Sequence, residues 1–121
     1  MIERRENGSV YYQFPNLLAF PGIQHGVFTR KGGCSPAPFD SLNVSLGVGD
    51  QGDRVEGNRQ MLSQWFGRAN LVFLNQVHGD RIRVFSRKDG PGDPTTPLVG
   101  DAMVTDIQHT ALVIQVADCQ A

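Results

Sequence analysis

The chain has 121 residues, of which 11 are Lys or Arg, 12 are Asp or Glu, and 40% are hydrophobic. This length suits one modest domain and excludes two well-packed ones. The formal net charge of −1 argues against binding to nucleic acid or to an anionic membrane surface, because a surface that binds many phosphate groups needs an excess of Lys and Arg. We therefore expect no nucleic-acid partner and no membrane partner.

Cysteine usage and the N-terminal residues favour a cytoplasmic protein. The two cysteines, Cys34 and Cys119, are too few for a disulfide framework. The chain begins with charged residues and lacks the apolar core of a signal peptide. Its longest apolar stretch, residues 111–117, is far shorter than the roughly 20 residues that cross a bilayer.

The first part of the chain predicts two strands and a loop. Residues 9–14 combine aromatic and β-branched side chains and end before Pro15, which is typical of a short strand. Residues 23–29 alternate imperfectly and predict a second strand, which leads into a basic turn at 30–33. Gly, Pro, Ser and Asp are dense over residues 32–41, so we expect a loop there.

One helix is predicted, over residues 53–66. Asp53 is placed to cap the first turn, Glu56 to reach back to that cap, and Gly67 to end the helix. Because Gly57 weakens a helix by about 1 kcal/mol relative to Ala, this helix should depend on packing against a sheet. Its expected apolar face consists of Val55, Leu62, Trp65 and Phe66.

The second half of the chain predicts four more strands, at residues 71–74, 82–85, 101–105 and 110–117, and a loop over residues 86–100. The last strand is almost continuously apolar and therefore needs cover on both faces. One helix cannot supply both layers. We expect the missing layer to come from a partner chain or from a larger domain of which this chain is the front part. The predicted fold class is α+β, with a mixed β-sheet and one main helix.

Two reactive side chains, His78 and Cys119, follow the ends of apolar strands, where a rigid scaffold meets a loop and functional sites are common. Each also has a plainer interpretation, Cys119 as a small buried apolar residue and His78 as a turn histidine bonded to a carbonyl group. Zinc suits an imidazole together with a thiolate, but it needs at least three protein ligands.

The other candidates are weaker. Arg30, beside Gly32 and Gly33, makes either an anion site or a basic surface loop. We expect His25 to line or pack a strand and His109 to lie exposed in a polar turn. Cys34 is expected to be a bystander in its loop.

Several short segments, in one order along the chain, resemble the laccase-domain proteins, also called the YfiH or polyphenol oxidase family and described as purine nucleoside phosphorylases. The resemblance begins near residue 22 and runs to the C-terminus. The matching segments are His25–Gly33, Leu42–Ser45, Gly49–Asp50, Val55–Arg59, Asn75–Gly79, Asp101–Thr105 and Ala117–Cys119.

The resemblance implies a YfiH-like fold that ends after the Ala-Asp-Cys strand, so residues 1–121 would form a single partial domain, the N-terminal half of the family domain. It also implies a metal site, zinc or in some descriptions copper, made from one Cys and two His. By position, His78 and Cys119 are the implied metal ligands and catalytic residues. The family's second His lies in a downstream His-x-Gly-Trp-Arg-Gly segment, which this sequence does not contain.

The resemblance further suggests substrate-binding roles for Arg30 and Asn43, and ligand-orienting roles for Asp101 and Asp118. The substrates implied are a small purine nucleoside and phosphate, with adenosine, inosine and methylthioadenosine not ranked. Family members are also described as deaminating adenosine and oxidising phenols. Phenol oxidation is the weaker inference, because it calls for several coppers and more than the 3 histidines present.

Two other functions stay open. In the first, the protein is a metal-free hydrolase with Cys119 as nucleophile and His78 as base. In the second, the chain is an inactive fragment or a partner-dependent subunit. Homo-oligomerisation would then be one way to cover the exposed sheet.

Overall fold

The computed structural model describes residues 1–89 and 98–117 of the chain. Backbone contacts group the chain into two compact units, Met1–Leu62 and Ser63–Ala121. Part of the expected loop over residues 86–100 lies outside the described residues, as do Asp118 and Cys119. Within the described residues, no helix combines the length and hydropathy that a membrane crossing needs.

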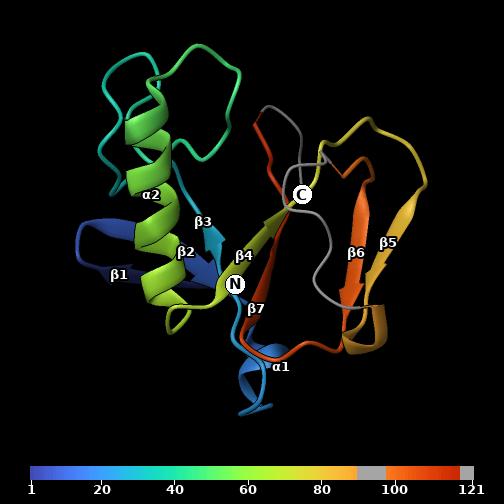
Figure 1. Ribbon diagram of the computed structural model, residues 1–121. Helices are drawn as coiled ribbons and strands as arrows, with labels where there is room; N and C mark the ends of the chain where they lie inside the picture. Colours follow the sequence, from blue (N-terminus) through green and yellow to red (C-terminus); the bar gives the residue numbers. More distant parts are fainter. Residues whose placement is uncertain (90–97, 118–121) are drawn as a thin grey trace. The chain divides into compact units, whose positions relative to one another are not determined.

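The first unit contains a three-stranded antiparallel sheet in the order β1–β2–β3 (Figure 1). Its strands are β1 (Ile2–Glu6), β2 (Ser9–Gln13) and β3 (Val27–Phe28). β2 confirms the strand expected at residues 9–14. β1 is an additional strand that forms a hairpin with β2 through Asn7 and Gly8, whose φ angles of 49° and 83° suit an Asn-Gly turn.

β3 is shorter than the strand expected over residues 23–29, because side chains take the place of further backbone bonds. Gln13 Nε2 donates a hydrogen bond to the carbonyl oxygen of His25 at 3.1 Å, and the N–H of Phe14 donates to His25 Nε2 at 2.8 Å. The short helix α1 (Pro15–Leu18) follows β2. Pro15 has no N–H to continue the strand and fits the first turn of a helix.

The main helix, α2 (Gly52–Trp65), confirms the helix expected over residues 53–66. The carbonyl oxygen of Gln51 accepts the first backbone hydrogen bonds of this helix, so Asp53 lies inside the first turn and does not precede it as a cap. Gly67 ends the helix as expected, with a left-handed φ of 66° that a residue without a Cβ adopts easily.

The buried face of α2 combines two expected apolar residues with one polar residue. Val55, Asn58 and Leu62 are buried, at spacings of three and four that place them on one side of the helix. Trp65 and Phe66 are half-buried and pack edge to face, with ring centroids 4.6 Å apart. A fully buried asparagine must have hydrogen-bond partners, and Asn58 finds them in the loop that precedes the helix.

The second unit contains two pairs of parallel strands (Figure 1). β4 (Asn70–Phe73) pairs with β7 (Thr110–Val113), and β5 (Ile82–Phe85) pairs with β6 (Ala102–Thr105), while a 3₁₀ turn, η1 (Arg87–Asp89), follows β5. These elements confirm the α+β class with one main helix. A single mixed sheet was expected. Within the described residues, the antiparallel pairs form one small sheet and the parallel pairs form two others.

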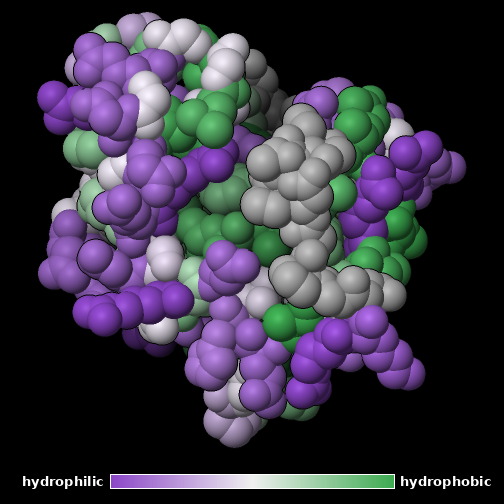
Figure 2. Space-filling model, viewed as in Figure 1, coloured by the Kyte–Doolittle hydropathy of each residue, from purple (hydrophilic) through white to green (hydrophobic). Residues whose placement is uncertain are grey.

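One face of the β5–β6 pair is apolar and exposed. Ile82, Val84 and Val104 are 60%, 67% and 55% exposed, and Val84 lies directly opposite Val104 in the strand register. Figure 2 shows green atoms among purple ones in the region of β5 and β6. The described residues therefore leave this face without an apolar layer on it.

Candidate functional site

The segment that carries His78 leaves β4 and changes its backbone partner. β4 is paired with β7 up to Phe73, but the N–H of Asn75 donates to the carbonyl oxygen of Leu98 at 2.8 Å, and the N–H of Gly100 donates to Asn75 O at 3.2 Å. Asn75 thus forms an isolated parallel bridge with Val99. Divergence of neighbouring strands at their carboxyl ends is a common setting for a binding site in sheets with parallel strands.

Asp101 holds the backbone around His78. Its Oδ1 accepts the N–H groups of Val77 at 3.0 Å and His78 at 2.8 Å, and its Oδ2 accepts the N–H of Gly79 at 2.8 Å. These bonds, from Gly79 first and then from His78 and Val77, hold the pKa of Asp101 below its usual value. His78 is kept in a left-handed conformation, with φ of 57° and an exposed side chain. The ligand-orienting role expected of Asp101 would therefore act through the backbone of residue 78.

Gln76 connects the same segment to the residues that follow β7. Its Oε1 accepts the N–H of Gln115 at 2.8 Å, and its Nε2 donates to the carbonyl oxygen of Gln115 at 3.2 Å. Because Gln115 bonds to a side chain and not to a neighbouring strand, β7 ends at Val113, short of the residue 117 expected from the apolar pattern.

The other two histidines occupy the positions expected for them. His25 packs against Phe14, with ring centroids 6.0 Å apart, in addition to accepting the Phe14 N–H. His109 is exposed in the turn before β7, with a left-handed φ of 55°, and its carbonyl oxygen accepts the N–H of Asn70. Neither lies in a group of three or more potential metal ligands among the described residues.

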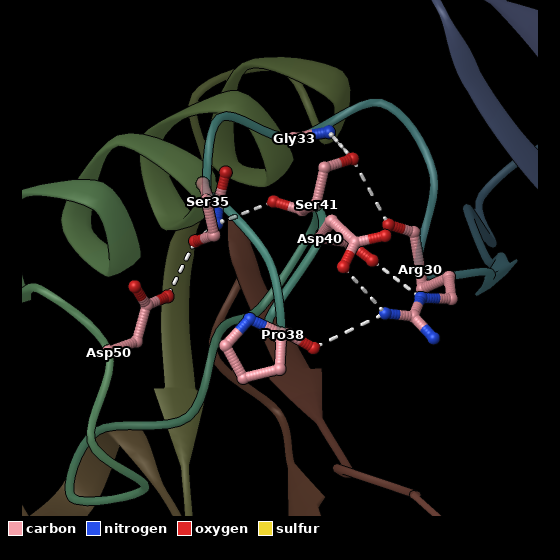
Figure 3. Close-up of polar contacts among 8 residues, drawn as sticks. Arg30, Gly33, Ser35, Pro38, Asp40, Ser41 and Asp50 are labelled. Carbon is pink, nitrogen blue, oxygen red and sulfur yellow. Dashed lines mark hydrogen bonds and ion pairs between the residues drawn. The ribbon is translucent and has the colours of Figure 1, made fainter.

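Arg30 lies in the first unit and is engaged with its own loop (Figure 3). Its Nε donates to the carbonyl oxygen of Asp40, and its Nη2 lies 3.1 Å from Asp40 Oδ1 and 3.4 Å from the carbonyl oxygen of Pro38. The N–H of Gly33, expected to help bind an anion, donates to Ser41 Oγ at 3.1 Å. The expected anion site is therefore occupied by internal contacts in this conformation.

Asn43 and Asp50 close a small loop between them. Asn43 Nδ2 donates to Asp50 Oδ2 at 2.9 Å, and Asn43 Oδ1 accepts the N–H of Ser45 at 3.0 Å. Ser35 Oγ also donates to Asp50 Oδ2, at 2.6 Å (Figure 3). Both ends of the Asn43 amide are thus bonded within the loop, so any contact of Asn43 with substrate competes with these bonds.

The hydrogen bonds to Asp50 make the stability of the first unit depend on pH. The hydroxyl of Ser35, followed by the amide of Asn43, lowers the pKa of Asp50 below its usual value. The charged form is favoured in the folded state, so its contribution is present above about pH 4 and is lost as the pH falls through the lowered pKa.

Replacing Asp50 with asparagine should lower the melting temperature at pH 7 more than at pH 3, because the charge matters only where Asp50 is ionised. Thermal unfolding of both proteins across this pH range measures the difference. If the two melting curves shift in parallel with pH, the hydrogen bonds to Asp50 do not provide this stabilisation.

Comparison with known proteins identifies the family. A model described as multi-copper polyphenol oxidoreductase laccase matches residues 24–121. The chain belongs to this family. The matched range agrees with the resemblance expected from about residue 22 onward.

Members of the laccase family with similar sequences include two curated phosphorylases. Purine nucleoside phosphorylase SCO2081 of Streptomyces coelicolor is 39% identical over 101 residues, which are 81% of this chain and 40% of the relative. Purine nucleoside phosphorylase YlmD of Geobacillus stearothermophilus is 38% identical over 106 residues, 83% of this chain and 39% of the relative. The chain thus spans about two fifths of the length of these relatives.

Two solved structures share this fold. The crystal structure of YlmD from Geobacillus stearothermophilus superimposes with a TM-score of 0.71 at 34% identity, over 92% of this chain and 43% of that one. Protein NMB0706 of Neisseria meningitidis gives a TM-score of 0.74 at 29% identity, over 94% of this chain and 43% of that one. The YfiH-like fold expected from the sequence is confirmed.

Two residues with structural roles, Gln76 and Asn58, have no role assigned from the sequence. Gln76 lies in the matching segment Asn75–Gly79, and Asn58 lies in the matching segment Val55–Arg59. An amide side chain beside apolar positions could have indicated both, because a buried amide needs several hydrogen-bond partners.

Proposed function

We propose that the full-length gene product cleaves purine nucleosides with phosphate, at a site to which this chain contributes His78 and Cys119. The observation that carries the proposal is the parallel pairing of β4 with β7. Parallel strands run in the same direction, so the segments that follow them leave the sheet at one edge. His78 follows β4, and the segment after β7 continues toward Cys119. Curated relatives named purine nucleoside phosphorylase support the reaction class.

The proposed cofactor is zinc, with copper as the second choice. An imidazole and a thiolate suit both ions by donor type. A zinc site needs at least three protein ligands, and the residues described in the structure contain no group of three His, Cys, Asp or Glu side chains suited to a metal. We propose that the third ligand is the family's second His, which the resemblance places downstream of the Ala-Asp-Cys segment. When bound, the ion would act as a Lewis acid that polarises phosphate or water.

The remaining roles belong to side chains of the chain itself. Asp101 fixes the backbone of His78, and Asp118 is proposed to orient the site from beside Cys119. Arg30 is proposed to bind phosphate, for which it must exchange its contact with Asp40. Both partners are exposed, at 66% and 57%, and an exposed ion pair contributes little free energy, so the cost of the exchange lies mainly in the bonds of Arg30 to the carbonyl oxygens of Asp40 and Pro38. Asn43 is proposed to act beside Arg30 at the substrate.

Three further proposals concern the protein as a whole. The chain would form the N-terminal part of a single laccase-like domain, with the apolar face of β5 and β6 covered by the rest of that domain or by a second copy. Deamination of adenosine is proposed as a second reaction, in which water attacks C6 of the purine, ammonia leaves and inosine forms. The exposed free thiol of Cys34 suits the reducing cytoplasm, where we place the protein.

The decisive experiment measures purine base released from inosine, adenosine and methylthioadenosine, with and without phosphate, together with zinc and copper content. The full-length gene product and the 121-residue chain are compared. For the full-length gene product we expect stoichiometric metal and a base release that depends on phosphate. We expect the isolated chain to lack both the metal and the base release. Inosine formation from adenosine reports deamination in the same samples.

The alternatives give different results in this experiment. If the protein is a hydrolase with Cys119 as nucleophile, its activity should persist in the presence of chelators and need no phosphate. Alkylation of Cys119 should abolish that activity. A non-catalytic subunit would show no metal and no turnover alone, and activity would return when the missing part is added. Base release that is independent of both phosphate and metal would overturn the proposed function.

A further inference from the structure

The structure contains a gap in the backbone pairing of β4 and β7, and one side chain fills it. The parallel register pairs Phe73 with Val113, and its continuation would place Asn75 opposite Gln115. In a parallel pair the N–H and carbonyl groups of Gln115 would bond to the backbone of the two residues that flank Asn75, which are Leu74 and Gln76. In the structure these two groups of Gln115 are bonded to the side chain of Gln76. The backbone of Asn75, which faces away from β7, bonds to residues 98–100.

The side-chain amide of Gln76 replaces these backbone partners. A primary amide carries one acceptor and one donor side by side, as a peptide group does, and Gln76 uses both on Gln115, at 2.8 Å and 3.2 Å. No other side chain of similar length has a neutral acceptor and a neutral donor in this arrangement. The methionine side chain has no strong donor or acceptor, and an ionised glutamate has acceptors but no donor.

We propose that Gln76 is a positioning residue, which sets the spacing between the segment that carries His78 and the segment that follows β7. This inference rests on the proposed function, because the spacing matters to catalysis only if both segments contribute to one site. Gln76 holds the His78 segment toward β7, and Asp101 holds it at the start of β6. The His78 backbone is thus fixed from two sides, which is the kind of support that a precise ligand position requires.

The test replaces Gln76 with methionine in the full-length gene product, with Gln64→Met as the matched control. Gln64 is an exposed residue of α2. We expect Gln76→Met to lower kcat or zinc affinity about 10-fold to 100-fold, as loss of a group supporting a metal ligand does, with little change in KM or melting temperature. Hydrogen exchange at the Gln115 amide should become faster. Gln64→Met should change none of these quantities.

A second variant separates positioning from folding. Gln76→Glu keeps an acceptor for the Gln115 N–H but turns an acceptor in place of the donor toward the Gln115 carbonyl oxygen, so its kcat should fall at least as far as that of Gln76→Met. The inference is overturned if Gln76→Met keeps native kcat and zinc affinity, or if every loss follows a fall in melting temperature.

Failure of the proposed function would be recognised separately. In that case the native protein shows no phosphate-dependent base release, while exchange at Gln115 and zinc affinity still report on Gln76. Where the native protein has no such activity to measure, a native zinc affinity in Gln76→Met would overturn the positioning role.

Discussion

Replacing His78 with asparagine in the full-length gene product is expected to lower phosphate-dependent base release more than about 100-fold, beyond the usual cost of losing a group that only supports a metal ligand. Asparagine tolerates the left-handed φ of 57° found at this position, so the backbone should be preserved while the imidazole is lost. Bound zinc should fall in parallel, because a site with few protein ligands cannot lose one and keep its affinity. Elemental analysis and the base-release assay measure the two effects.

His109 provides a closely matched control. It is also exposed, and it also lies in a turn with a left-handed φ, of 55°. His109→Asn therefore makes the same chemical change in the same backbone conformation, away from the proposed site. It should keep native zinc content and activity. Equal losses in the two variants would show that the effect at residue 78 is not specific, and native activity in His78→Asn would remove His78 from the site.

The elements predicted well are those whose signals are local. α2 was predictable because its apolar positions repeat at helical spacing and Gly67 supplies a stop. β5 was predictable because a short apolar run is bounded by turn residues. β1 is different, because all five of its residues are exposed and its sequence is mostly charged. The signal for β1 lay in the Asn7-Gly8 turn beside it, which favours a hairpin whatever the polarity of the strands.

Strand ends were harder to predict, because side chains compete with backbone groups there. The apolar pattern extends β7 to residue 117, but the Gln76 amide takes the backbone groups of Gln115. In the same way, Gln13 and His25 take over pairing before β3. Contacts of this kind join residues far apart in sequence, so hydropathy patterns carry no information about them.

The location of the candidate site stays a prediction, and the structure adds the contacts around it. The end of an apolar strand points to His78, and the family resemblance assigns Asp101 a ligand-orienting role. The sequence did not indicate that Asp101 binds three consecutive backbone N–H groups, because backbone donors are the same in every residue. It also did not indicate that Arg30 would be paired with Asp40, since that contact depends on how the loop folds back.

The most destabilising single substitution in the first unit should be at Asn58, which is fully buried on α2. Its Oδ1 accepts the N–H of Cys34 at 2.8 Å. Its Nδ2 lies 2.9 Å from Ser35 Oγ, 3.1 Å from Ser41 O and 2.7 Å from Asn43 O. One amide therefore anchors the loop that precedes the helix at four points.

Asn58→Leu should destabilise the protein by about 2–4 kcal/mol, because it removes the partner of the Cys34 N–H and of the Asn43 carbonyl oxygen, and each unpaired buried group costs about 1–3 kcal/mol. Some of these groups are half-buried, so water will restore part of the loss. Asn58→Asp keeps the shape and the acceptor for Cys34 but turns a charge toward two carbonyl oxygens, so it should be at least as damaging at neutral pH. Urea unfolding measures both variants, with Gln60→Leu on the exposed side of the same helix as the control. If Asn58→Leu matched that control in midpoint, and backbone amides near Cys34 exchanged at native rates, the loop would have to be held by its other contacts, which include the bond from Arg59 Nε to Val44 O and those of Arg30 and Asp50.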